Sequence, residues 1–486
     1  MNGRSLEVAM LASLVGCTLG PEFHAPAAPQ LGGYTAEPMP AANAGGEAPY
    51  DRSQAYTHVT SLPSLWWSEF GSAELDALVA RALSRNPTIA AADAALLQAQ
   101  ETAAAQRGTF APSLQASYAP VRARVSDAVA SPLSSGASLY TLHTGQLSVS
   151  YGMDVFGANR RTVESLDAQS ESQAWQWRAA RLSLAANVVN AALQLASLTR
   201  QLQATERIVA IGTHQLELLQ TQRRLGAAAG AAVYAQEALV SQSEVSAAAL
   251  RKQLAQQRDL LAVLLGDLPS EHASSTLDLM TLRLPDVPLT LPGRLVDQRP
   301  DVRAALAQLH AADAQVGVAA ANMLPQITLT GNYGASAEAF ADLFKAAGLM
   351  WALGLNLTQP VFEGGTLQHR KRAAEAQARQ AMAQYQSTVL NAFQNVADAL
   401  EATRHDADQY LAARRQELAA EALLRIAQRQ LQLGDISYLV LLNAQSTALQ
   451  ATVSRIQAHA SRFSDTVAVY QALGGGWDEP PGANEH

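Results

Sequence analysis

Two long segments without proline constrain the fold of this 486-residue chain more than any other feature. Neither residues 133–268 nor residues 361–479 contain a proline, although the chain has 20. Within the second segment, residues 366–433 also lack glycine, and at a rise of 1.5 Å per residue a helix of that length measures about 100 Å. A compact domain has no room for such a helix. The pattern therefore predicts a coiled-coil rod or a helical barrel.

A matching segment in the first half, from Arg160 to Leu225, contains a single glycine, Gly212. In both segments, apolar residues recur at steps of three and four, which is near the coiled-coil period. The residues between them are mainly Ala, Gln, Ser and Asn, which let helices approach closely on several sides, as the wall of a tube requires. An ordinary long coiled coil has the same period and stays an alternative. The two apolar seams are Leu184, Val188, Ala191, Leu195, Leu198 and Leu202, and Tyr385, Val389, Phe393, Val396 and Leu400.

Short segments in the proline-bearing regions alternate polar and apolar residues. Residues 146–151 do so, as do residues 327–330 and 351–358. Small polar residues on one face and Leu, Val or Trp on the other suit strands of a barrel with lipid outside and water inside. A half-buried soluble sheet gives the same alternation in any single strand. No segment has the roughly 18–20 consecutive apolar residues of a transmembrane helix, so a membrane crossing would use strands.

The two halves of the chain match at a nearly constant offset, which predicts a tandem duplication. Pro87 corresponds to Pro300, 213 positions later, and Gly226 corresponds to Gly434, 208 positions later. We assign repeat 1 to residues 71–283 and repeat 2 to residues 284–473, each with the order helix, strand, hairpin, strand, long helix, turn, helix. Proline is well tolerated in the first turn, so Pro87 and Pro300 are expected helix starts.

Two strands per repeat give four per chain, which is too few to close a transmembrane barrel, because the smallest bacterial form has about eight. An open sheet edge in lipid is prohibitively costly. If the strands span a membrane, the protein must be an oligomer with a shared barrel. The periodicity leaves eight and twelve strands equally open.

The only cysteine follows an apolar segment, in the sequence Leu14-Val15-Gly16-Cys17. Small residues before a cysteine at this place resemble the lipobox of bacterial lipoproteins. We therefore predict a signal peptide at residues 1–16, lipidation of Cys17, and an N-terminal extension at 17–70. Thr18 follows the cysteine where an Asp would indicate the inner membrane, so the outer membrane is expected. The alternative is a buried cysteine near the N-terminus.

Several classes of function are disfavoured by composition and motifs. The net charge is -8 and no Lys/Arg block stands out, which argues against nucleic acid as a partner. One cysteine excludes a disulfide framework, and the ten histidines form no zinc-binding pair. The sequence has no phosphate-binding loop, no nucleophile elbow and no dinucleotide fingerprint. We expect no enzyme, no metal and no cofactor.

Six motifs resemble, in the same order, those of the outer-membrane factors of tripartite efflux systems, the TolC-like and NodT-type lipoproteins. The resemblance runs over nearly the whole chain, and six motifs in order are far more specific than any one of them. The motifs are the lipidated start CTLGPEF at 17–23, LWWSEF at 65–70 followed by LDAL at 75–78, DVFGANRR at 154–161, RPDV at 299–302, QPVFEGG at 359–365 and LGGGW at 473–477. The last motif overlaps the C-terminal tail, which we assign to 474–486.

This resemblance implies mixed α and transmembrane β structure. A homotrimer would share a twelve-stranded β-barrel in the outer membrane, continued by a long α-helical coiled-coil barrel across the periplasm. The protein would be a passive, gated exit duct, anchored to outer-membrane lipid. An inner-membrane pump and a periplasmic adaptor would be its partners. The runner-up is a periplasmic coiled-coil adaptor lipoprotein, which would lack four amphipathic strands and the duplication.

Residues 430–445 resemble the turn and the start of the inner helix at the periplasmic tip, where relatives narrow to a gate. The apolar ring of that gate maps onto Leu439. The acidic ring maps onto Asn443, where relatives carry Asp, and the next candidate for the charged position is Asp435. Leu439 and Asn443 are four residues apart and share a helix face. The alternative is that both pack between helices at the tip.

Overall fold

The computed structural model describes residues 20–29, 32–46, 52–126, 128, 136–271, 277–290 and 292–475. This part of the chain forms two compact units, each assembled from separate stretches of sequence. The first unit takes residues up to 26, 95–174 and 304–386, and the second takes residues 27–94, 175–303 and those from 387 onward.

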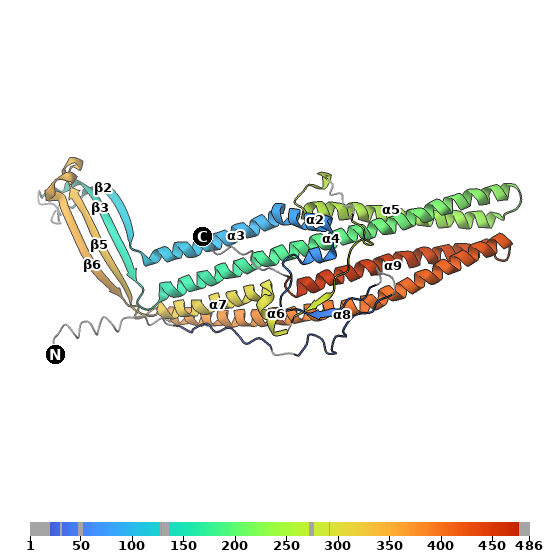
Figure 1. The fold of residues 1–486 in the computed structure, drawn as a ribbon. Helices are drawn as coiled ribbons and strands as arrows, with labels where there is room; N and C mark the ends of the chain where they lie inside the picture. The colour runs from blue at the N-terminus through green and yellow to red at the C-terminus, as the bar shows by residue number, and fades with distance from the viewer. Residues whose placement is uncertain are drawn as a thin grey trace. The chain divides into compact units, whose positions relative to one another are not determined.

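A four-stranded antiparallel sheet lies in the first unit (Figure 1). Its strand order is β2, β3, β5, β6. One hairpin consists of β2 and β3 and the other of β5 and β6, and the two hairpins are joined by the pairing of β3 with β5. Proline and glycine breaks before each hairpin end the preceding helices, and alternating residues then favour extended chain. The strands are β2 (Ser113–Arg124), β3 (Leu139–Met153), β5 (Gln326–Ala337) and β6 (Leu349–Thr358).

Four helices pass from one unit to the other along the chain, and the rest of the helices lie in the second unit. The shared helices are α3 (Pro87–Arg107), α4 (Ala158–Arg224), α7 (Pro300–Ala321) and α8 (Thr366–Leu433). The second unit adds α2 (Ala73–Arg85), α5 (Gly230–Leu264), α6 (Pro292–Gln298), α9 (Tyr438–Ala472) and a parallel pair of short strands, β1 (Tyr56–His58) and β4 (Val287–Leu289). Short 3-10 helices occupy Trp66–Phe70, Gly108–Phe110, Pro269–Glu271, Phe340–Phe344 and Ala346–Gly348.

The order helix, strand, strand, long helix, helix occurs twice, from α3 to α5 and from α7 to α9. α4 has 67 residues and α8 has 68, while α5 and α9 have 35 each. Both turns between a long and a shorter helix carry a glycine with positive φ, Gly226 at 76° and Gly434 at 81°. A side chain is strained in that conformation, so glycine is the residue that allows the chain to reverse there. Pro87 and Pro300 begin helices, as predicted.

The predicted seams are the buried faces of the long helices. Leu184, Val188 and Leu195 on α4 are at most 7% exposed, and Val396 and Leu400 on α8 are at most 1% exposed. Leu202, at the end of the first seam, and Phe393, in the middle of the second, are half-buried. One 18-residue window of α4 is long and apolar enough to cross a membrane by composition, but 67% of it is buried. Its apolar character therefore serves helix packing.

Small residues hold α8 and α9 together along the length that they share in the second unit. Ala420 packs with Ala448 and Ala451, and nearer the turn Ala427 packs with Leu441 and Ala444. Alanine at the contact positions lets two helix backbones approach closely. At the other end of α9 the core is aromatic, where Trp66 stacks on Tyr470 at 5.3 Å between ring centroids.

Candidate membrane-facing sheet and pore gate

The register of the sheet sorts its side chains into two chemically distinct faces. In an antiparallel pair, residues directly opposite each other point to the same side. Leu147 pairs with Tyr333, and Tyr333 pairs with Trp351, so one line of large apolar residues crosses three strands. This apolar face comprises Leu114, Tyr118, Leu147, Val149, Tyr151, Met153, Ile327, Leu329, Tyr333, Leu349, Trp351, Leu353, Leu355 and Leu357.

The opposite face carries small and polar side chains over the same length. Gln146 pairs with Gly334, and Thr330 pairs with Gly354. The polar face comprises Ser113, Gln115, Ser117, Thr144, Gln146, Ser148, Ser150, Gln326, Thr328, Thr330, Asn332, Ser336, Asn356 and Thr358, with Ala and Gly between them, and near the hairpin loops also Val121, Tyr140, Leu142 and Met350. Such residues suit a surface wetted by water.

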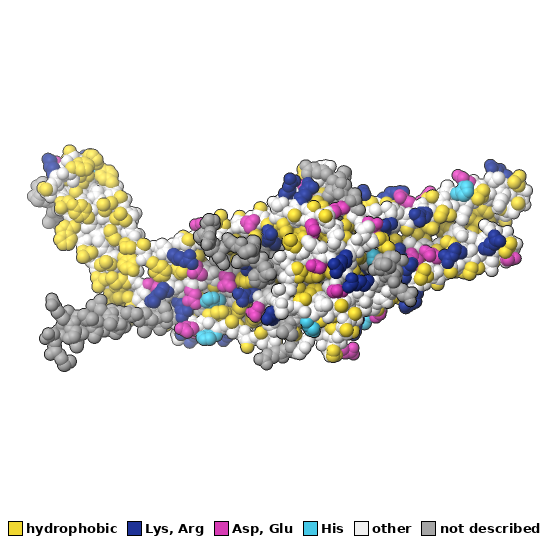
Figure 2. Space-filling view, in the orientation of Figure 1, with side chains coloured by type: hydrophobic (Ala, Val, Ile, Leu, Met, Phe, Trp, Pro, Cys, Tyr) yellow, Lys and Arg dark blue, Asp and Glu magenta, His cyan; other side chains and the backbone are white. Residues whose placement is uncertain are grey.

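The rest of the chain leaves the apolar face uncovered. Trp351, Leu353 and Leu355 on β6 are 75%, 72% and 67% exposed, and hydrophobic side chains gather over the strands in Figure 2. A soluble protein rarely leaves so large a contiguous apolar surface uncovered. The half-buried soluble sheet, which the alternation alone left open, would bury this face. The observed arrangement is that of strands with lipid on one side and water on the other.

The sheet also has two open edges. Within the described residues, β2 pairs only with β3, and β6 pairs only with β5. Unpaired backbone N–H and C=O groups along an edge are very unfavourable in lipid. The same four strands therefore need partners at both edges as well as an apolar surrounding.

The gate candidates lie on the exposed side of the α8–α9 turn and of the first turns of α9. Leu439 is 60% exposed, and Asn443 and Asp435 are exposed as well. The packed side of α9 consists of other residues. Tyr438 donates its hydroxyl to Gln236 of α5 at 3.2 Å, and Gln445 donates to Gln215 of α4 at 2.8 Å. Within one chain, Leu439 and Asn443 thus face away from the neighbouring helices.

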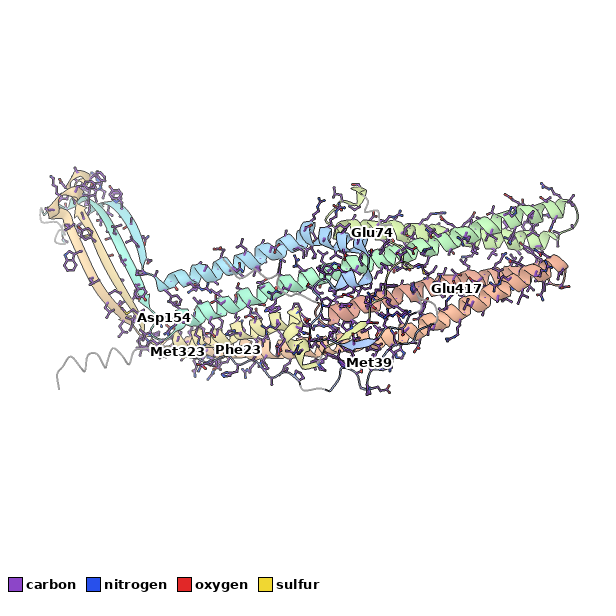
Figure 3. The ribbon with its side chains drawn as sticks, in the orientation of Figure 1. Phe23, Met39, Glu74, Asp154, Met323 and Glu417 are labelled. Carbon is purple, nitrogen blue, oxygen red and sulfur yellow. The ribbon has the colours of Figure 1, made fainter. Side chains whose placement is uncertain are left out.

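Cys17 lies outside the described residues, but the segment that follows it has a defined seat in the first unit (Figure 3). Phe23 stacks on His310 of α7 at 4.4 Å between ring centroids. His310 and Arg161 both hydrogen-bond the Glu164 carboxylate, at 2.9 and 2.7 Å, and these bonds hold the pKa of Glu164 below its usual value against the effect of burial. Arg161 also donates to the carbonyl of Gly20.

The helices of the second unit contain buried charges that the sequence did not predict. Glu417 of α8 accepts hydrogen bonds from Arg414 at 2.8 Å and from Arg455 of α9 at 2.6 Å, and its side chain is 4% exposed (Figure 3). A lone Glu within a long helix ordinarily faces water, so periodicity gave no signal for it. The only available hint was the spacing of three between Arg414 and Glu417.

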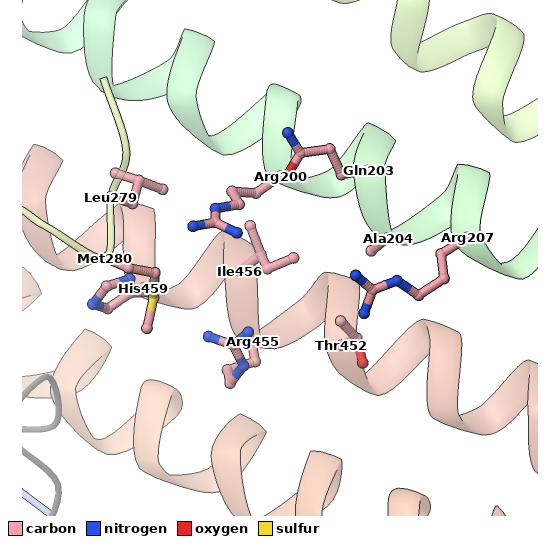
Figure 4. A pocket seen from close by; sticks show the side chains of 10 residues that line it. All are labelled: Arg200, Gln203, Ala204, Arg207, Leu279, Met280, Thr452, Arg455, Ile456 and His459. Carbon is pink, nitrogen blue, oxygen red and sulfur yellow. The ribbon is translucent and has the colours of Figure 1, made fainter. Parts of the chain in front are cut away.

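A cavity of about 270 Å³ lies between α4, α9 and residues 279–280 (Figure 4). Arg200, Arg207 and Arg455 project into it, together with His459. Two of these arginines are already neutralised, Arg200 by Asp278 and Arg455 by Glu417. The cavity is therefore a packing feature with paired charges. Among the described residues, no three His, Cys, Asp or Glu side chains gather to hold a metal ion.

Comparison with known proteins gives a consistent answer along the chain. The family model for outer membrane efflux proteins matches residues 78–267 and 291–475. The pyoverdine export outer membrane protein OpmQ of Pseudomonas putida is 30% identical over 416 residues, which are 85% of this chain and 88% of OpmQ. The outer membrane protein OprJ of Pseudomonas aeruginosa is 29% identical over 480 residues, or 96% of this chain and 94% of OprJ.

The solved structure of the outer-membrane channel OprN superposes with a TM-score of 0.83 at 27% identity, covering 95% of this chain and all of the OprN chain. The agreement therefore includes the sheet and the long helices alike. The chain belongs to the outer membrane efflux protein family, the TolC-like outer-membrane factors, and is an outer-membrane exit channel of a tripartite efflux system that extends into the periplasm.

Proposed function

We propose that three copies of this chain close a single twelve-stranded barrel and act as a gated, passive duct. The observation that carries this proposal is the sorting of the sheet, which exposes its apolar face and carries small polar residues on the other. Four strands are too few for a closed barrel of about eight strands or more. Pairing β2 of one copy with β6 of the next would satisfy both open edges. The family resemblance favours three copies over two.

The same proposal treats the chain as a tandem duplication. The repeated element order supports this, as does the near-equal length of α4 and α8. The two segments matched by the family model are separated by residues 268–290, which include the boundary that the sequence predicts at 283/284. Two similar hairpins, each from one repeat, would give the shared barrel a pseudo-sixfold arrangement.

Transport through this duct would be driven by the inner-membrane pump, with a periplasmic adaptor joining the two membranes. The polar face of the sheet would line the water-filled interior of the barrel, and Leu439, Asn443 and Asp435 would form the periplasmic gate. The chain itself would carry out no catalytic step. Lipid on Cys17 would anchor the assembly to the outer membrane. The alternative of a coiled-coil adaptor gives no role to an exposed apolar sheet, and the family membership argues against it.

The test compares two substitutions at the same depth on opposite faces. Leu353 pairs with Gly331 on the apolar face, and the adjacent Asn332 pairs with Ala352 on the polar face. Leu353→Lys places a charge in lipid, at a cost of about 2–4 kcal/mol near the membrane centre, whereas Asn332→Lys places it in water. In mild detergent, wild type and Asn332→Lys should have the native mass of three chains and show heat-modifiable migration, and Leu353→Lys should assemble poorly.

A monomeric native mass together with unimpaired transport would contradict the proposal of a barrel shared between three copies. Equal tolerance of Lys on the two faces, with normal assembly, would show that the apolar face does not meet lipid.

A further inference from the structure

The four long strands carry only two Lys, Arg, Asp or Glu side chains, and both are arginines near the end of β2. Arg122 and Arg124 are exposed and two residues apart, so they point to the same face. That face is the apolar one, because the alternation from Leu114 and Tyr118 along β2 continues to Arg122. Neither arginine has an acidic partner among the described residues. Two charges placed together on a surface that otherwise faces lipid need an explanation.

The amphipathic pattern reverses at the level of these arginines. Up to Tyr118 the large side chains of β2 are on the lipid face, but beyond it Val121 points to the polar side while Arg122 points outward. The paired strand changes in the same way at this level, since Leu142 points to the polar side and Thr141, opposite Arg122, points outward. Leu139, at the start of β3 and opposite Arg124, is a large apolar residue that still points outward. Where a strand leaves the hydrocarbon layer, its outward-facing residues no longer need to be apolar. The reversal therefore marks the border of the hydrocarbon layer just before Arg122.

Strand geometry agrees with this border. From Leu114 to Arg122 the chain rises about 26 Å at 3.3 Å per residue. A tilt of about 40° reduces that rise to about 20 Å along the membrane normal, close to the height of the apolar band of such barrels. Arg122 thus stands at the headgroup level, and Arg124 extends one further step out.

Aromatic side chains surround the same level. The Tyr118 hydroxyl hydrogen-bonds His143 Nδ1 at 2.8 Å, and Phe340 lies edge-on to the Tyr118 ring at 5.8 Å between centroids. Phe344, against Phe340, is 81% exposed. Aromatic rings with polar edges are enriched where a membrane meets water. They form a belt on the hydrocarbon side of the two arginines.

This end of the sheet is the one far from the helices along the chain. β2 begins where α3 and its 3-10 extension end, and β3 ends just before α4, so both hairpin loops lie at the opposite end. Since the helices belong to the periplasmic part of the proposed duct, the arginines meet the outer leaflet. At that depth the matching ligand is a phosphate, because the guanidinium group binds phosphate through two parallel N–H donors.

We propose that Arg122 and Arg124 bind the phosphate groups of an anionic glycolipid in the outer leaflet of the outer membrane. This inference rests on the proposed function, because it needs the apolar face of the sheet to lie in lipid. It assigns the two arginines to the lipid surface of the barrel and not to its cargo, since both point away from the polar face. Each copy in the assembly would hold one such site.

The test uses the intact oligomer in a neutral detergent, with lipid binding followed by native mass spectrometry. The probes are diphosphorylated lipid A and a dephosphorylated lipid A with the same acyl chains. Wild type should bind the phosphorylated lipid at least about tenfold more tightly, and salt should weaken that preference. Arg122→Gln/Arg124→Gln should lose the preference and keep its oligomeric mass. The matched control is Arg223→Gln/Arg224→Gln, a pair of arginines at the end of α4, which should keep it.

Three results would overturn the site. The first is equal binding of the two lipids by wild type, and the second is an unchanged preference in the Arg122/Arg124 variant. The third is competition by inorganic phosphate at concentrations that match the lipid phosphate, which would indicate a site for a soluble anion. Failure of the proposed function gives a different signature, because the wild-type protein would then be monomeric before any lipid is added.

Discussion

Asn443 stands on the exposed side of α9, one helical turn beyond Leu439. If the proposed gate is correct, threefold symmetry brings three neutral amides together where the family resemblance implies three carboxylates. Close carboxylates attract cations and raise one another's pKa, and Asn removes both effects. We therefore expect Asn443→Asp to increase cation selectivity in planar-bilayer recordings, and Leu439→Ala to make the closed channel leakier.

A carboxylate elsewhere on the tip gives the control for this prediction. Gln432 is exposed in the last turn of α8, so Gln432→Asp adds the same charge on the other side of the turn. Its cation selectivity should change less than that of Asn443→Asp. If neither Asn443→Asp nor Leu439→Ala alters selectivity or conductance while assembly is normal, these residues do not line the constriction, and Asp435 becomes the next candidate.

Two buried titratable residues of α9 give the stability of the second unit opposing pH dependences. Burial, with the nearby Arg462 and Arg455, lowers the pKa of His459 from 6.5 to about 4. Burial and a hydrogen bond to Asp406 raise the pKa of Asp465 from 3.8 to about 7. Between about pH 4 and 6.5, His459 is protonated in the unfolded chain and neutral in the folded one. Between about pH 3.8 and 7, Asp465 is protonated in the folded chain and ionised in the unfolded one. The His459 contribution to stability therefore grows as pH rises toward 6.5, and the Asp465 contribution falls as pH rises toward 7.

Single substitutions should separate the two effects. Asp465→Asn keeps a hydrogen-bond donor for Asp406 without an ionisable proton, so the variant should gain stability over wild type as pH rises from about 3.8 to about 7, and the gain should level off above about 7. His459→Gln removes the opposite contribution, so its stability relative to wild type should be lowest near neutral pH. Midpoints of thermal unfolding in detergent, measured from acidic to neutral pH, check both. Parallel pH curves for the two variants would contradict the assignment.

At the scale of elements, the contact between α8 and α9 includes one buried carboxylate beside its small apolar residues. Glu417 neutralises both Arg414 of its own helix and Arg455 of the facing helix. Glu417→Gln would leave two arginines largely buried without a counter-charge, and breaking a buried pair in this way costs about 3–5 kcal/mol. The denaturation midpoint should fall clearly.

The matched control is Glu206→Gln, which removes an exposed ion pair between α4 and Arg251 of α5. Exposed pairs contribute about 1 kcal/mol or less, so this variant should unfold close to wild type. Equal destabilisation in the two variants would mean that the Glu417 cluster has no special role in holding α8 to α9.

The helices were predictable from sequence to within a few residues, and the strands only in part. The absence of breakers placed the second long helix at 366–433, where α8 lies, because helix ends need a glycine, a proline or a cap. In β5 the alternation was visible only at residues 327–330, since Gly331, Gly334 and Ala335 present no large side chain. In β2, Pro120 and Arg122 occupy the apolar face and hide its period.

Pairings between distant parts of the chain were beyond the sequence analysis. β1 and β4 are three residues each and pair in parallel, with Tyr56 opposite Val287. Three residues carry no readable period, and no local turn fixes their register. The buried charges of α8 and α9 were hidden for a related reason, because only the facing helix determines which polar side chain is covered.

At the scale of the whole molecule, the compact units are not the two proposed repeats. Each unit contains corresponding stretches of both proposed repeats. The first unit, for example, contains residues 95–174 and residues 304–386. The proposed repeats follow one another in the sequence, but each compact unit is built from parts of both. Neither repeat alone holds a complete unit, and we expect no stable product from expressing one repeat by itself.

The proposed lipid anchor concerns the whole molecule, because it would add to the attachment that the proposed barrel gives in the membrane. Cys17→Ser should lose radiolabelled palmitate and be processed abnormally, while Thr18→Ser should keep the label. Partial transport should survive in Cys17→Ser, since the proposed barrel spans the membrane, and Phe23 on His310 still seats the following segment. Absence of label in wild type would show that the lipobox prediction is wrong.

The central strand pair, β3 with β5, has a consequence for biogenesis. β3 ends at Met153 and β5 begins at Gln326, so 172 residues separate the partners along the chain. At roughly 5–20 residues per second of synthesis, the first hairpin waits on the order of 10–30 s for its neighbour. During that time its unpaired strand edges and its apolar face are exposed to water. We therefore expect a newly made chain to need a holding chaperone in the periplasm, and shortage of that chaperone should deplete this channel before it affects proteins with early-pairing strands.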